Sequence, residues 1–197
     1  TLQIDNRIIK SHDLIMTSSP AKSNNREQTR MTLINAAEEL FAQSGIDGVS
    51  LRQINVTAGQ KNSSAVHYHF GSKESLIIAI FEKRMTEVNQ RRLNSLDSIE
   101  SEGELTNVRR LIEALIHPIV DEINADKSGQ HYIRFMAYAI GHPQLNLNKI
   151  WTQENANSYA RLLKLLREAL PHVPDPIFGQ RFALSFEQIV HSLADRE

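Results

Sequence analysis

Apolar residues recur at helical spacing along the chain from Arg26 onwards, and no segment alternates apolar and polar residues as a half-buried strand would. The first such segment has Leu33, Ala37 and Leu40 on one face. In the second half of the chain, prolines separate segments that we predict to be helical near 104–126, 129–141, 144–170 and 177–195. The pattern predicts an all-α fold.

The residues before this pattern differ from the rest of the chain. Residues 1–25 include a polar stretch rich in turn-forming residues, so we expect a flexible tail. No apolar run approaches the roughly 20 residues that a membrane-spanning helix needs, and no signal-peptide pattern opens the chain. The chain has no cysteine, which excludes disulfides and thiolate metal sites. We therefore expect a cytoplasmic protein with no membrane partner.

Several local signals divide the segment after the tail into short helices. Gly45 follows the first helix as a C-terminal cap, because glycine adopts the left-handed conformation found there. Ser50 to Gln53 has the form of a capping box and begins a second helix. Asn62 is placed to cap a third helix over 63–70, and a long fourth helix begins at Lys73.

Two short helices joined by a tight turn form a helix-turn-helix when the second can enter the major groove of DNA. The third segment begins with the small residues Ser63 and Ser64, which allow close approach to the groove. It continues with His67, Tyr68 and His69, whose polar groups are able to bond bases or phosphates. Tyr68 has a second interpretation, as a residue that only covers the core.

Charge supports an anionic partner for this segment. The whole chain has a formal net charge of −1, so any nucleic-acid surface must be local. Arg52, Lys61 and Lys73 are basic, and no acidic residue lies between the first and the last of them. Lys73 also begins a helix, where backbone N–H groups help to hold a phosphate.

The segment resembles the N-terminal domain of the TetR family of transcriptional regulators. The resemblance rests on the run 32–45, on Val49 to Ile54, on Ala58-Gly59, and on the block from His67 to Leu76. It implies a DNA-binding head over 26–76 and a helical ligand-binding and dimerisation body over 77–197. It also implies a homodimeric repressor that binds a palindromic operator in double-stranded DNA and is released by a small-molecule effector.

The resemblance assigns roles to matching positions. Ser50, Arg52 and Thr57 would contact phosphates; Ser63, Ser64 and His67 would read bases; Tyr68, Lys73 and His69 would hold the DNA backbone, with packing under the turn as the alternative for His69. One more residue than usual lies between Gly59 and His67, so the register of the base-reading residues is open by one position.

The body has a segment rich in aromatic and sulfur-containing side chains, the types that line adaptable apolar cavities. We predict a pocket for an apolar or aromatic ligand lined by His117, His131, Phe135, Met136, Tyr138 and Trp151. Each of these residues is also an ordinary core residue, and that alternative stays open.

The last two helical segments are apolar around more than one face, which indicates that a partner chain covers them. We predict a dimer interface formed by Leu162, Leu166, Phe182, Phe186, Ile189, Val190 and Leu193. Burial of these residues within one subunit is the alternative.

No catalytic motif is present, so we expect neither an enzyme nor a cofactor. His67 and His69 point about 200° apart on a helix and cannot easily share a metal ion. The alternative function is a ligand-independent DNA-organising or protein-recruiting factor with the same DNA-binding head.

Overall fold

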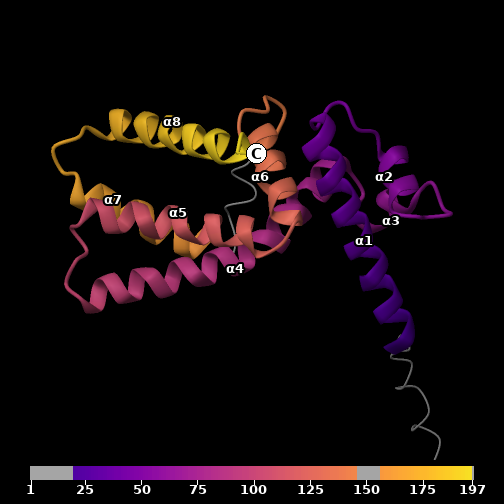
Figure 1. Ribbon diagram of the computed structural model, residues 1–197, viewed down its shortest axis with the longest axis horizontal. Helices are drawn as coiled ribbons and strands as arrows, with labels where there is room; N and C mark the ends of the chain where they lie inside the picture. The colour runs from indigo at the N-terminus through magenta and orange to yellow at the C-terminus, as the bar shows by residue number, and fades with distance from the viewer. Residues whose placement is uncertain (1–19, 146–155, 197) are drawn as a thin grey trace, which may run out of the picture.

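The computed structural model describes residues 20–145 and 156–196, and these residues form helices only (Figure 1). In chain order the helices are α1 (Pro20–Ser44), α2 (Leu51–Thr57), α3 (Ala65–Phe70), α4 (Lys73–Ser101), α5 (Val108–Ala125), α6 (Ser128–Ala139), α7 (Ala156–Ala169) and α8 (Asp175–Ala194). Helices α1 to α3 form the head, and the later helices form a body beside it, with α6 between α1 and the other body helices (Figure 1). The all-α prediction is confirmed. Residues 20–25, which we expected in the flexible tail, instead form the first part of α1, and the rest of that tail lies outside the described residues.

The helix boundaries of the head follow local signals in the sequence. Gly45 ends α1 with a φ of +70°, a conformation that side-chain-bearing residues rarely adopt. Ser50 caps α2 and forms the expected capping box, since its Oγ accepts from the Gln53 N–H at 3.2 Å and its own N–H donates to Gln53 Oε1 at 2.8 Å. Ser72 caps α4 in the same way by accepting from the Ser75 N–H.

The third helix begins later than its sequence predicts. Asn62 Oδ1 accepts from the Ser64 N–H at 2.9 Å, which forms a turn before the helix instead of capping it at residue 63. The helix α3 therefore starts at Ala65, and Ser63 and Ser64 lie in the turn. This corrects the expectation that both serines occupy the third helix.

The core continues from the head into the body. Phe41 of α1 stacks on Phe135 of α6 at a centroid distance of 5.9 Å, and Phe135 meets Phe81 of α4 at 5.0 Å. All three side chains are buried in one cluster that includes residues of α1 to α6 and of α8. Because α4 also runs through residue 76 without interruption, the head is held firmly against the body.

A second apolar cluster fills the far end of the body, where α4, α5 and α7 meet. Leu162 and Leu166 are buried in it, and Val190 is buried in the first cluster. The expectation that these residues lie between two subunits is corrected, because side chains inside one chain are not available to a partner. Phe182, Phe186 and Ile189 are half-buried, and Leu193 is 9% exposed.

Helix α8 also has apolar side chains that are exposed to solvent. Leu184 is 66% exposed and Ile177 is 41% exposed. Among the described residues, no helix is long and apolar enough to span a membrane.

Candidate nucleic-acid interface and body cavity

The outer surface of the head is formed by α3 and the turn before it. Ala65 and Val66 are buried, while Ser63, Ser64 and His67 are exposed. Tyr68 is 69% exposed, which is unusual for a large aromatic side chain. The interpretation of Tyr68 as a core cover therefore fails, and its ring and hydroxyl are available to a partner.

The orientation of α3 depends on a buried residue of α2 that the sequence interpretation missed. Asn55 is 2% exposed, and its Nδ2 donates to the Ser63 carbonyl at 2.6 Å. Its Oδ1 accepts from the Val66 N–H at 3.1 Å, so one amide holds both the turn and the first residues of α3. Because this side chain spans the longer turn, the extra residue there does not loosen α3 from α2.

Two arginines of α1 add positive charge beside α3. The guanidinium carbon of Arg26 lies 5.7 Å from the centre of the Tyr68 ring, and that of Arg30 lies 5.3 Å from the centre of the Phe70 ring. Burial and then the charges of both arginines lower the pKa of His69, against the charge of Glu27, which disfavours the protonated imidazole. Arg26 and Arg30 are four residues apart and share a helix face, a signal that the sequence contained.

The edge formed by α2 carries the remaining residues expected to contact phosphate. Arg52, Thr57 and Lys61 are all exposed. Ser50 is exposed as well, but its Oγ already takes part in the capping box and lies 2.7 Å from Gln53 Oε1. The exposed side chains of this edge are neutral or basic, as are those of α3, which suits an anionic partner.

The contacts of Lys73 are with the loop between α1 and α2 and not with this surface. Its Nζ donates to the carbonyl of Val49 at 2.6 Å and to the carbonyl of Ile46, and its charge lies 5.5 Å from the centre of the Phe41 ring. Burial lowers its pKa, against the charge of Asp47. Lys73 thus fastens the loop between α1 and α2, which differs from the expected phosphate clamp because the ammonium group already has acceptors.

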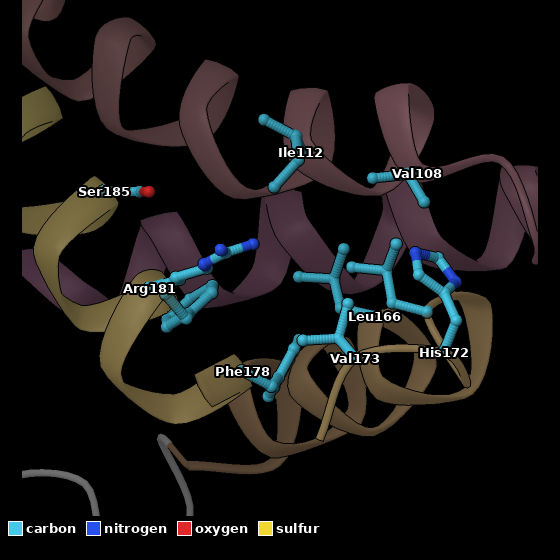
Figure 2. Close-up of a pocket in the computed structure, with 10 residues that line it drawn as sticks. Val108, Ile112, Leu166, His172, Val173, Phe178, Arg181 and Ser185 are labelled. Atoms are coloured by element: carbon cyan, nitrogen blue, oxygen red, sulfur yellow. The ribbon is translucent and has the colours of Figure 1, made fainter. Parts of the chain in front are cut away.

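The body contains a cavity of about 340 Å³ between the start of α5, the end of α7 and the first half of α8 (Figure 2). Val108 and Ile112 of α5 and Leu166 of α7 provide apolar walls, and Arg181 of α8 and His172 are its titratable lining residues (Figure 2). Such a cavity is large enough for a small organic molecule.

The residues expected to line a pocket lie in several places. Phe135 and Met136 are buried in the core between head and body, His131 is half-buried, and Tyr138 is 50% exposed. His117 is exposed beside a second, more polar hollow of about 260 Å³. The two cavities described here thus have only His117 in common with the expected set, and Trp151 lies outside the described residues.

A buried ionic network joins the head to the body. Arg84 of α4 is 5% exposed, and its Nε and Nη2 donate to the two carboxylate oxygens of Glu38 in α1 at 3.0 and 2.5 Å. Its Nη1 donates to Glu122 of α5 at 2.9 Å, and Nη2 also contacts Ser128 of α6 at 2.5 Å. Burial opposes the charge of Arg84, but hydrogen bonds to Glu38 and Glu122 outweigh this effect and raise its pKa.

Both halves of the chain match family models. Residues 33–80 match the model of bacterial regulatory proteins of the tetR family, and residues 113–197 match the tetracycline repressor-like C-terminal domain. The chain therefore belongs to the TetR family, in agreement with the all-helical structure of its described residues.

Curated relatives match over part of their length. The chain is 34% identical over 64 residues to the HTH-type transcriptional repressor NicS of Pseudomonas putida, which is 32% of this chain and 30% of that protein. It is 32% identical over 73 residues to the HTH-type transcriptional repressor AcnR of Corynebacterium glutamicum, which is 36% of this chain and 38% of that protein. Both alignments thus span about a third of the relatives they match.

A solved structure shows the same fold. The TetR-family transcriptional regulator PfmR from Thermus thermophilus aligns with a TM-score of 0.52, at 18% identity, over 81% of this chain and 84% of that one.

Proposed function

We propose that the chain is a homodimeric transcriptional repressor that binds a palindromic DNA operator through α2 and α3 and is released by a small-molecule effector. The observation that carries the proposal is the exposed Tyr68 with Arg26 beside its ring, together with exposed Arg52 and Lys61 on the head and no exposed carboxylate on α2 or α3. The relatives NicS and AcnR are named as transcriptional repressors, which supports the same role here.

The proposal assigns different tasks to different residues of this surface. His67 and Tyr68 of α3, with Ser63 and Ser64 in the turn before it, face the groove and contact bases or nearby phosphates. Exposed Arg52 and Lys61 neutralise phosphates, which gives affinity that depends on salt concentration but not on sequence. A repressor needs both contributions, since phosphate contacts position a protein on DNA and base contacts select the site.

The dimer is proposed to form through the outer face of α8 together with α7. Exposed Leu184 and half-buried Phe182 and Phe186 support this placement, because such apolar surface is normally covered. Two heads held about one turn of DNA apart then read the two halves of a palindrome. An effector that favours a different head spacing weakens DNA binding by the same factor by which DNA weakens effector binding.

Capture of genomic DNA fragments by the purified chain near physiological salt tests the proposal. We expect enrichment of one palindromic site by the wild type and by Tyr138→Ala, which removes an exposed tyrosine from the body, and loss of that site with Tyr68→Ala. Equal retention of all fragments by every variant would overturn the repressor function and favour a DNA-organising factor instead.

A further inference from the structure

The centre of the body contains a second buried arginine whose surroundings differ from those of Arg84. Arg92 of α4 is 1% exposed. Its Nη1 donates to Asn89 Oδ1 at 3.1 Å and to Ser158 Oγ at 3.3 Å, and its Nη2 donates to the Leu115 carbonyl at 3.4 Å. All three acceptors are neutral, and no carboxylate in the described residues forms an ion pair with Arg92.

Arg92 remains a cation despite its burial. Loss of hydration lowers the pKa of Arg92 to about 10, which still leaves the guanidinium protonated at neutral pH. A buried positive charge without an anion is strongly unfavourable, and such charges in proteins are normally paired. The protein therefore keeps a charge here that its own described residues do not balance.

The unused polar atoms at this place are all donors. Arg92 Nε and Asn89 Nδ2 are buried and have no hydrogen-bond partner among the described residues. The orientation of the Asn89 amide is fixed, because its Oδ1 already accepts from Arg92 Nη1 and from Ser158 Oγ, the latter at 2.8 Å. Within the described part of the chain, what is missing is thus an acceptor, and the charge of Arg92 favours an anion.

The geometry of the free donors favours a planar anion. Nε and Nη2 share one edge of a guanidinium, and this edge binds the two oxygens of a carboxylate in a fork. Nε is free, and Nη2 has a second N–H beside its long contact with Leu115. Leu115, whose carbonyl accepts from Nη2, is itself buried, so the surroundings of this guanidinium are apolar.

We propose that Arg92 and Asn89 bind the carboxylate of a small organic acid with an apolar or aromatic body. The inference rests on the proposed function in that it names the chemical class of the effector, but its chemistry is independent of DNA. Arg92 joins α4 to α5 through Leu115 and to α7 through Ser158, so a ligand at this place contacts the helix that leaves the head.

The test is a thermal-unfolding series on the full chain without DNA, with benzoate and octanoate as probes and benzamide and octanamide as neutral controls. The acids are expected to raise the Tm of the wild type and the amides are not. Arg92→Met is expected to raise the Tm of the ligand-free chain by about 2–4 °C or more, because it removes an unbalanced buried charge. This variant is also expected to lose the response to the acids.

Arg92→Lys provides a second variant that keeps the charge but lacks the fork, and we expect it to bind benzoate at least about tenfold more weakly than the wild type. The proposal is overturned if acids and amides act alike on the wild type, if Arg92→Met keeps the response to the acids, or if Arg92→Met lowers the Tm of the ligand-free chain. Failure of fragment capture together with success here would overturn the DNA function and leave the carboxylate site standing.

Discussion

The two buried arginines of α4 lie eight residues apart, about 12 Å along the helix, and have opposite surroundings. Arg84 contacts the carboxylates of Glu38 and Glu122, whereas the described partners of Arg92 are neutral. The pKa of Arg84 is raised by its partners, and that of Arg92 is lowered by burial. On the same helix, Arg84 thus holds the head against the body through ion pairs, whereas Arg92 has free hydrogen-bond donors that are proposed to bind a carboxylate.

The two arginines also connect the proposed carboxylate site to the head. Arg84 ties α1, which belongs to the head, to α4, α5 and α6, so movement of α4 relative to α5 is resisted at this point. Farther along α4, Arg92 donates to Leu115 of α5 and to Ser158 of α7. An anion at Arg92 would contact helices that Arg84 couples to the head, which is how the proposed site would influence DNA binding.

The largest expected effect on stability comes from removing Arg84 from its ion pairs with Glu38 and Glu122. Arg84→Met leaves Glu38 and Glu122 buried without their main cation, and we expect it to lower the free energy of unfolding by about 3–5 kcal/mol. Urea denaturation at fixed protein concentration measures this change. A loss below about 1 kcal/mol, within the range of exposed ion pairs, would show that the network does not fasten the head.

A smaller effect is expected when Arg92 is given a carboxylate partner, as Arg84 already has. Asn89→Asp places a carboxylate where Oδ1 already accepts from Arg92 at 3.1 Å, and a charged acceptor strengthens this bond by about 1 kcal/mol. The new pair lowers the folded-state pKa of the carboxyl group, so the added stability is present at neutral pH and is lost as the pH falls through that lowered value.

Urea denaturation of Asn89→Asp at pH 7 and at pH 3 checks both parts of this prediction. The variant should also lose its response to benzoate, because its own carboxylate occupies Arg92. A variant that is less stable than the wild type at pH 7 would mean that Arg92 is already balanced.

The smallest effect is expected at an exposed ion pair between the same helices. Arg161 of α7 contacts Asp97 at 2.6 Å and Glu100 at 2.5 Å of α4, but both carboxylates are well exposed. Arg161→Gln is therefore expected to lower the free energy of unfolding by only about 0.2–1 kcal/mol, and by less at high salt. A loss of stability as large as that of Arg84→Met would show that burial does not decide how much an ion pair contributes to the free energy of unfolding.

Much of the head could be predicted from the sequence, because its signals are local. The capping box at Ser50, the left-handed Gly45 and the start of α4 depend on residues within a few positions of one another. The sequence predicts the start of α3 two residues too early, because Asn55 and Asn62 hold the preceding turn through side-chain hydrogen bonds that compete with the helix.

The body was less predictable, because its contacts join distant residues. Arg84 and Glu38 are 46 positions apart in the sequence, and Arg92 and Ser158 are 66 positions apart, so no short sequence motif predicts either site. Helical periodicity identifies a buried face but not its partner, so it does not decide between a pocket and the core for Phe135, or between an interface and the core for Leu162, both of which are buried.

The central claim is that the surface around Tyr68 binds a specific DNA site, and the affinity for a captured fragment tests it most directly. Fluorescence anisotropy at physiological salt would compare that fragment with a shuffled sequence for the wild type and for Tyr68→Ala. The account predicts that the wild type binds the captured fragment at least about 1,000-fold more tightly than the shuffled one, and that Tyr68→Ala loses most of this preference. Equal affinity of the wild type for both sequences would contradict it.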